Sequence, residues 1–155
     1  MQELKKGGLG QGIGKSRGGF TSKIHAATDE NGKAMCIFIT GGNVYDSTQA
    51  ENLLQDIIYK GTYVLKDKAF DAEPILKYIE KNKGIAVIPP RKNRKDQKEY
   101  DKNIYKNRNQ IEHFFNRLKQ FRRIATRYDK LLSSFLSFVQ LAIVFITIPK
   151  FPLIV

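Results

Sequence analysis

Apolar residues in the first third of the chain fall into short runs that predict strands followed by a helix. Phe20–Thr28 alternates in part between apolar and polar positions, and Ala34–Thr40 is a nearly continuous apolar run. Asp29–Gly32 between them has the composition of a turn, so we expect the two runs to form a β-hairpin. Asp46–Tyr59 opens with Asp and Ser and then shows apolar residues at helical spacing, which predicts a helix.

The middle of the chain continues with a strand, a helix and a second strand. Tyr63–Leu65 and Ile85–Ile88 are short apolar runs of the kind that form buried strands. Between them we expect a helix that is capped by Asp71, runs to about Lys83 and accommodates Pro74 in its first turn. The two strands are therefore separated by a helical crossover.

The last third of the chain is helical by pattern. After a polar loop at Arg91–Asp101, helical spacing predicts one long helix from about Asn103 to Tyr128. Leu131–Ile148 carries no charge and reaches the lower limit of a membrane-spanning length. Serine, glutamine and threonine dilute this run, so we interpret it as a packed terminal helix; a membrane-anchored protein is the alternative. The order of elements predicts an α/β fold whose sheet mixes antiparallel and parallel strands.

Charge adds a candidate partner to this outline. The 155 residues include 27 Lys and Arg against 15 Asp and Glu, a net charge of +12. Arg91–Lys130 alone holds 14 basic and 5 acidic residues, so the basic character is concentrated in one segment. Such a balance favours a polyanion partner, of which nucleic acid is the commonest. Seven glycines in Gly7–Gly19 predict that residues 1–19 form a flexible basic arm, followed by a domain over 20–148 and a tail over 149–155.

Several classes of protein are excluded by what the sequence lacks. Cys36 is the only cysteine, which excludes a disulfide framework and a cysteine-based zinc site. Gly10–Ser16 has the look of a phosphate-binding loop, but Leu9 stands where that motif needs glycine. No signal peptide is visible at the N-terminus, so we expect a cytoplasmic protein.

One face of the predicted long helix carries the most informative residues. At about 100° per residue, Tyr105, Arg108, Glu112 and Lys119 lie within about 60° of one another. A core stripe is expected beside this face, formed by Ile104, Ile111, Phe115 and Leu118. The face therefore presents one carboxylate among three side chains that can bind phosphate. The simpler alternative is an exposed helix with an Arg108–Glu112 ion pair, and geometry alone favours it.

A second carboxylate can meet Glu112. Asp67 lies where a predicted strand ends and a loop begins, which is the usual position of reactive groups in an α/β sheet. Two carboxylates that converge in this way suit divalent cations such as Mg²⁺, which promote phosphoryl transfer. The surrounding Lys and Arg side chains would follow a DNA backbone.

The spacing Tyr105-x2-Arg108-x3-Glu112-x6-Lys119 also matches the Y-R-E-K signature of a known family. In this signature and in neighbouring stretches the chain resembles bacterial insertion-sequence transposases of the DDE class. The resemblance extends from about Gly10 to Ile148, with matching stretches at 14–25, 46–50, 67–71, 88–91 and 114–128.

The resemblance implies a ribonuclease-H-like fold, a mixed sheet flanked by helices, that uses Mg²⁺ or Mn²⁺ to cleave and join transposon-end DNA. Asp67 and Glu112 would be the second and third catalytic, metal-binding carboxylates. The DNA-binding residues implied are Tyr105, Arg108, Arg117, Lys119, Arg122, Arg123 and Arg127.

The family's first Asp lies on a strand before the glycine-rich segment, and this sequence contains no such strand. The resemblance thus implies the C-terminal part of a catalytic domain without its first strand, from a truncated or split reading frame and inactive alone. Its expected partners are double-stranded DNA, an upstream half of the same transposase and a second copy of the chain. A basic nucleic-acid-binding module without catalytic activity is the alternative function.

Overall fold

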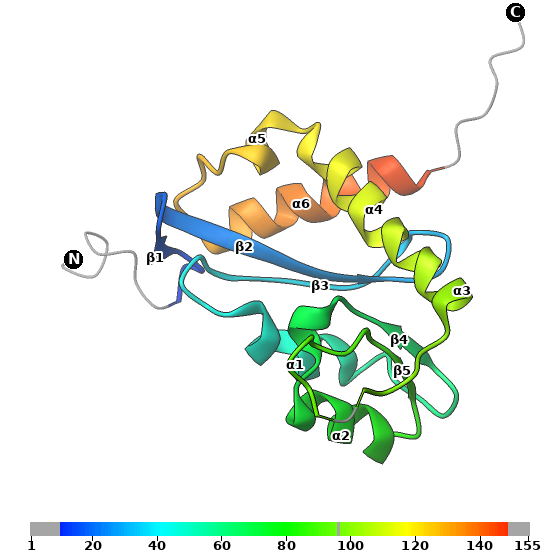
Figure 1. Cartoon of the computed structure of the whole chain (residues 1–155). Coiled ribbons are helices and arrows are strands. Elements are labelled where there is room, and N and C mark those ends of the chain that lie inside the picture. The colour runs from blue at the N-terminus through cyan, green and yellow to red at the C-terminus, as the bar shows by residue number, and fades with distance from the viewer. Residues whose placement is uncertain (1–9, 96, 149–155) are drawn as a thin grey trace, which may run out of the picture. The chain divides into compact units, whose positions relative to one another are not determined.

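The computed structural model describes residues 10–95 and 97–148, which form two compact units (Figure 1). The first unit comprises Met1–Ile24, Phe38–Asn43 and His113–Val155, as far as these ranges are described. The second unit comprises His25–Ile37 and Val44–Glu112.

A three-stranded sheet contains the predicted hairpin. Its strands β1 (Gly14–Ser16), β2 (Gly19–Thr28) and β3 (Ala34–Gly41) are neighbours in that order. The turn after β2 is stabilised by Asp29, whose carboxylate accepts the backbone N–H groups of Asn31 and Lys33 at 2.9 and 2.8 Å. The side chain thus replaces backbone partners within the turn, as Asp commonly does at such sites, and the predicted hairpin is confirmed.

The structure differs from the flexible arm that we expected up to residue 19. Gly14 pairs with Thr21 and Ser16 with Gly19, so residues 14–16 form an antiparallel strand on β2. Gly14 is required there because a Cβ atom would lie 1.7 Å from the side-chain oxygen of Asn43. The glycine-rich composition therefore serves close backbone approach at this position. Residues 1–9 and the expected tail at 149–155 lie outside the described residues, and the boundary at residue 20 stays a prediction.

The two predicted strands of the second unit form a separate sheet. β4 (Tyr63–Leu65) pairs in parallel with β5 (Ile85–Val87), with Tyr63 opposite Ile85 and Leu65 opposite Val87. The expectation of one mixed sheet is wrong for the part of the chain that the structure describes. A mixed sheet needs a strand that pairs with antiparallel and parallel neighbours on its two edges, and no described strand does so.

The helices of the second unit are shorter than the sequence pattern predicts. Residues 46–59 contain a 3-10 turn, η2 (Asp46–Gln49), and a short helix, α1 (Ala50–Leu54). The next helix, α2 (Glu73–Lys81), has Pro74 in its first turn as expected, but its N-cap is Ala72. The expected capping role of Asp71 is wrong, because its carboxylate accepts the backbone N–H of Arg91 at 2.8 Å.

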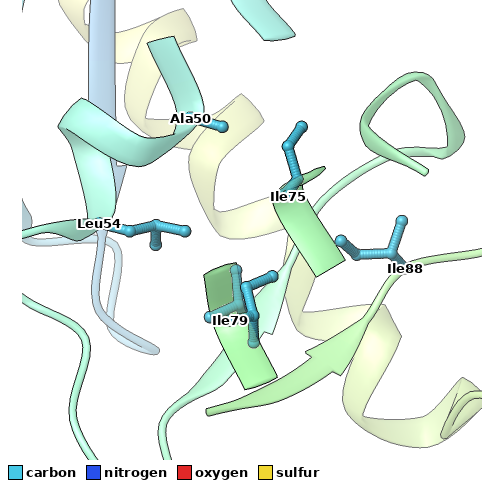
Figure 2. Close-up of a cluster of buried hydrophobic side chains, with 6 residues drawn as sticks. Ala50, Leu54, Ile75, Ile79 and Ile88 are labelled. Carbon is cyan, nitrogen blue, oxygen red and sulfur yellow. The ribbon is translucent and has the colours of Figure 1, made fainter. Parts of the chain in front are cut away.

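The core of the second unit lies between these two helices and the parallel strands. Figure 2 shows side chains of this cluster directed toward one another from α1, α2 and the residue after β5. The buried members are Ala50, Leu54, Val64, Ile75, Ile79 and Ile88. Because both short strands contribute few hydrogen bonds, apolar burial in this cluster is the main stabilising contribution to the sheet that carries Asp67.

Ile79→Ala is expected to destabilise the protein by about 2–5 kcal/mol, because Ile79 is only 1% exposed and its truncation leaves a cavity. Urea denaturation followed by circular dichroism measures the change. The matched control is Leu141→Ala on α6 (Leu132–Thr147), since Leu141 is 64% exposed and should change stability by less than about 0.5 kcal/mol. An equal effect of the two substitutions would contradict this assignment of the core.

The expected long helix from Asn103 to Tyr128 is not continuous. It consists of four pieces: α3 (Lys102–Tyr105), the 3-10 turn η4 (Lys106–Arg108), α4 (Asn109–Lys119) and α5 (Arg122–Ala125). A 3-10 turn advances about 120° per residue instead of about 100°, so η4 rotates α4 relative to the extrapolated helix. The buried side of α4 also differs from the expected core stripe: Phe114 is 1% exposed, while Phe115, which we expected in the core, is half-buried.

The break between α4 and α5 has a tertiary cause. Phe121 adopts an extended conformation, with φ −77° and ψ 105°. Its ring makes edge contacts with Phe138 and Phe145 of α6, at centroid separations of 6.5 and 5.9 Å. Neither glycine nor proline marks this position in the sequence, so aromatic packing against α6 accounts for the interruption.

The C-terminal helix α6 confirms the predicted packed helix. It buries Phe135, Val139 and Ala142. Within residues 10–95 and 97–148, no helix combines the length and the apolar character that a membrane crossing requires.

Candidate functional site

Asp67 lies at the end of β4 and begins a tight turn. Its backbone is extended, with φ −75° and ψ 170°, and the 3-10 turn η3 (Lys68–Phe70) follows. One carboxylate oxygen, Oδ1, accepts the backbone N–H of Ala69 at 2.7 Å. This bond fixes the direction of the carboxylate, and the Asp67 side chain as a whole is exposed. The sequence prediction for Asp67, a carboxylate at a strand end, is confirmed in its local geometry.

Positive charge surrounds Asp67. The Lys66 ammonium lies 4.6 Å from the centre of the Phe70 ring. Burial lowers the pKa of Lys66, and the nearby carboxylates of Asp67 and Asp46 oppose that shift. Lys66 is thus a desolvated cation beside an exposed carboxylate.

The loop after β5 is bound to the turn that contains Asp67. The Arg91 guanidinium donates to the carbonyl oxygens of Lys68 and Ala69, at 3.3 and 2.7 Å. The carboxylate of Asp71, whose side chain is 5% exposed, forms an ion pair with Arg94. Arg94 also pairs with Glu73 at 3.0 Å. These contacts fasten the loop to the residues immediately after Asp67.

Glu112 forms an ion pair with Arg108. The distance from Arg108 Nη2 to Glu112 Oε1 is 2.7 Å, and the Glu112 side chain is 55% exposed. The Arg108 guanidinium also lies 5.7 Å from the centre of the Tyr105 ring. Tyr105, Arg108 and Glu112 therefore form a chain of contacts along one side of three successive helical pieces. An exposed helix without a catalytic role also predicts this ion pair.

The pKa of Arg108 depends on its hydrogen bond to Glu112 and on nearby charges. Partial burial by itself lowers the pKa of Arg108, but the hydrogen bond to Glu112 and the charges of Tyr105, Glu112 and Asp67 outweigh it and raise the pKa. The hydrogen bond joins Arg108 to Glu112, and the charge of Asp67 makes the smallest contribution to the pKa, so Asp67 and Glu112 act on Arg108 to different extents. Both belong to the second unit.

The remaining predicted DNA-binding residues lie on α4, α5 and the segment after α5. Lys119 and Arg122 are exposed, at the end of α4 and the start of α5. Arg117 is exposed and lines a pocket of about 350 Å³ together with Phe121 and Phe145.

Two of the predicted DNA-binding arginines have internal partners. Arg123 makes a two-pronged pair with Asp129, Nε at 3.0 Å and Nη2 at 2.5 Å. Arg127 donates to the carbonyl oxygens of Gln11, Gly12, Asp129 and Lys130 and to the hydroxyl of Ser22. Its guanidinium also lies 4.9 Å from the centre of the Phe135 ring. These contacts differ from the role in DNA binding that we expected for Arg127 and give it a structural role in the first unit.

Asp67 and Glu112 are the two carboxylates that the sequence predicts for a metal site. No group of three or more His, Cys, Asp or Glu side chains in residues 10–95 and 97–148 is arranged to hold a metal ion. Asp67 and Glu112 supply two carboxylates, which alone make up an incomplete ligand set for a Mg²⁺ ion.

Sequence reasoning missed the contributions of Lys66, Asp71 and Arg91. A usable signal was present for Arg91, because Asp67 and Arg91 both follow strands that are parallel and separated by a helical crossover. The carboxyl ends of parallel neighbours lie at the same edge of a sheet, which brings the two loops together. The contacts of Asp71 with Arg91 and Arg94 could not be predicted from the sequence pattern, because these residues are about twenty positions away.

Comparison with known proteins gives two matches and one negative result. The profile of a family described as Transposase DDE domain matches residues 2–146. A Brucella ovis protein named as a transposase for insertion sequence element IS6501 is 41% identical over 123 residues, which cover 79% of this chain and 94% of the relative. No solved structure matches the chain significantly.

Proposed function

This chain belongs to the DDE transposase family, and we propose that Asp67 and Glu112 are two of the carboxylates with which such a domain cleaves and joins DNA. The observation that carries the proposal is geometric: each carboxylate is exposed and held by one hydrogen bond of 2.7 Å, Asp67 by the backbone N–H of Ala69 and Glu112 by Arg108. Family membership supports the class of reaction, and the local geometry of the two carboxylates supports their assignment.

The two carboxylates fit the divalent metal that the family implies. Asp67 and Glu112 are exposed and offer hard oxygen ligands of the type that Mg²⁺ and Mn²⁺ prefer. A divalent ion held there would activate the nucleophile and stabilise the leaving oxygen in phosphoryl transfer. We propose Mg²⁺ or Mn²⁺ as the cofactor.

Arg108 has a distinct part in this proposal. In the structure without DNA it neutralises Glu112 and keeps its carboxylate in place at 2.7 Å. A guanidinium can also bind two phosphate oxygens at once, so Arg108 can bind the DNA backbone beside the carboxylates. Tyr105 orients the guanidinium through its ring. Lys119 and Arg122 would follow the backbone through phosphate contacts that carry no sequence information.

We further propose that the catalytic site requires a third carboxylate from a partner polypeptide, such as an upstream half of the same transposase. A ribonuclease-H-like arrangement of strands would then be completed by that partner, and transposon ends would be held by two copies of the assembly. Support comes from the resemblance, by which Asp67 and Glu112 correspond to the second and third of three catalytic carboxylates, and from the several oxygen ligands that Mg²⁺ prefers.

Incubation of the isolated chain with supercoiled plasmid DNA tests the proposal, and duplex binding and strand joining are the two quantities measured. With Mg²⁺ or Mn²⁺, we expect salt-dependent binding of duplex DNA and no strand joining, because the proposed third carboxylate is absent from the assay. Metal-dependent strand joining by the 155-residue chain alone would refute the requirement for a partner. The control is the same assay with EDTA, which should leave binding unchanged.

A specific observation favours a second candidate function. The Arg108–Glu112 pair is an ordinary contact between residues four apart, as found on many exposed helices. On this view the chain is a basic DNA-binding module without catalytic activity. Metal-dependent cleavage in the presence of a complementing partner separates the two functions, since only the catalytic one produces it.

A further inference from the structure

We propose that Arg91 is a positioning residue for the Asp67 carboxylate, a role that rests on the proposed function of Asp67. The Arg91 side chain does not bind the Asp67 carboxylate directly. It acts on the turn that follows, where its guanidinium donates to the carbonyl oxygens of Lys68 and Ala69 at 3.3 and 2.7 Å.

The effect reaches Asp67 through the two peptide groups on either side of the Ala69 Cα atom. Ala69 accepts a hydrogen bond from Arg91 at its carbonyl and donates its own N–H to Asp67 Oδ1 at 2.7 Å. The backbone of Phe70 closes the turn by donating to the Asp67 carbonyl at 3.0 Å. Fixing the Ala69 carbonyl therefore fixes the residue whose amide orients the carboxylate.

Arg91 is itself held in place by a buried charge. Its backbone N–H donates to Asp71 Oδ2 at 2.8 Å, and the other oxygen of Asp71 pairs with Arg94. Gln97 donates to the carbonyl oxygens of Arg91 and Arg94 at 3.2 and 2.9 Å. The backbone of the loop after β5 is thus held in place by these hydrogen bonds. From this loop, the Arg91 side chain extends to the turn that follows Asp67.

The chemistry of the contact favours arginine over lysine. A planar guanidinium presents several donors in fixed directions, so one side chain can bind two successive carbonyl oxygens. A lysine ammonium is a point charge on a flexible chain and orients the two peptide groups less well. Such supporting contacts commonly change ligand affinity or activity by about 10–100-fold when removed.

Hydrogen exchange of isotope-labelled alanine amides in the full chain tests this role. In Arg91→Met we expect the exchange rate at Ala69 to rise roughly tenfold, the effect of losing one charge-assisted hydrogen bond, with intermediate exchange in Arg91→Lys. Ala50 and Ala142, which are buried elsewhere, should keep their rates. The matched control is Lys92→Met, which removes a neighbouring exposed charge and should leave Ala69 unchanged.

Titration with Mn²⁺ in the same samples gives a second readout. Paramagnetic broadening of the Ala69 amide should require about 10–100-fold more Mn²⁺ in Arg91→Met than in the unsubstituted chain. Unchanged Ala69 exchange in Arg91→Met, or faster exchange at all three alanines, would overturn the positioning role. Absence of Mn²⁺ broadening at Ala69 in the unsubstituted chain would instead contradict the proposed metal site, and the exchange comparison would still decide the role of Arg91.

Discussion

Asp67→Asn and Glu112→Gln are each expected to lower metal-dependent strand cleavage by about 10³-fold or more, while duplex binding stays within about twofold. Each substitution removes one anionic oxygen ligand and preserves the size of the side chain. The effect of each is large because both carboxylates serve one reaction centre. Cleavage of transposon-end DNA is measured with the polypeptide that supplies the first carboxylate present, and binding is measured by gel shift.

The control for these two substitutions is Glu80→Gln. Glu80 is an exposed carboxylate on α2 of the same unit, so its loss changes the net charge by the same amount. Cleavage by this variant should match the unsubstituted chain. Normal cleavage by Asp67→Asn or by Glu112→Gln would show that the affected residue is not a member of the catalytic site.

Arg127→Met is expected to lower the free energy of unfolding by about 2–4 kcal/mol, because a partly buried network loses its central charged donor. The carbonyl oxygens of Gln11 and Gly12 and the hydroxyl of Ser22 lose a partner. The methionine keeps apolar contact with Phe135 and so limits the loss of packing. Urea denaturation followed by circular dichroism measures the change.

Arg122→Met provides the matched comparison for Arg127. Arg122 is exposed at the start of α5, so its substitution should change stability by less than about 0.5 kcal/mol. It should also reduce the salt dependence of DNA binding by about one unit of slope, as the loss of one phosphate contact does. If Arg127→Met instead weakens DNA binding without loss of stability, Arg127 belongs to the DNA-binding surface.

The candidate site was largely predictable where local pattern and spacing determine it. The end of an apolar run placed Asp67 at a strand end, and spacing placed Tyr105, Arg108 and Glu112 on one side of a helical segment. The contact chain formed by these three residues is present in the structure. Helical periodicity failed beyond them because Phe121 leaves the helix to pack on α6.

The role of each charged side chain was much less predictable. Arg122 and Arg127 are alike in the sequence, both basic residues in a basic segment, yet one is exposed and the other donates to five oxygen atoms within the first unit. Asp71 precedes a helix, as capping residues do, yet its carboxylate serves Arg91 and Arg94 about twenty residues later in the sequence. Periodicity describes only neighbours within a segment and contains no information on partners from distant segments.

The sequence by itself determined the family, the hairpin, the two parallel strands with the helix between them, and the two carboxylates proposed for catalysis. These follow from motif spacing, from the alternation of apolar and polar residues and from the end of an apolar run, all of which are local properties. Only the tertiary structure decided that the strands form two sheets, that Arg127 is bound within the first unit, and that Arg91 is bound to the Asp67 turn. The physical reason is that hydrogen bonds and ion pairs between distant segments depend on packing that brings their atoms within about 3 Å.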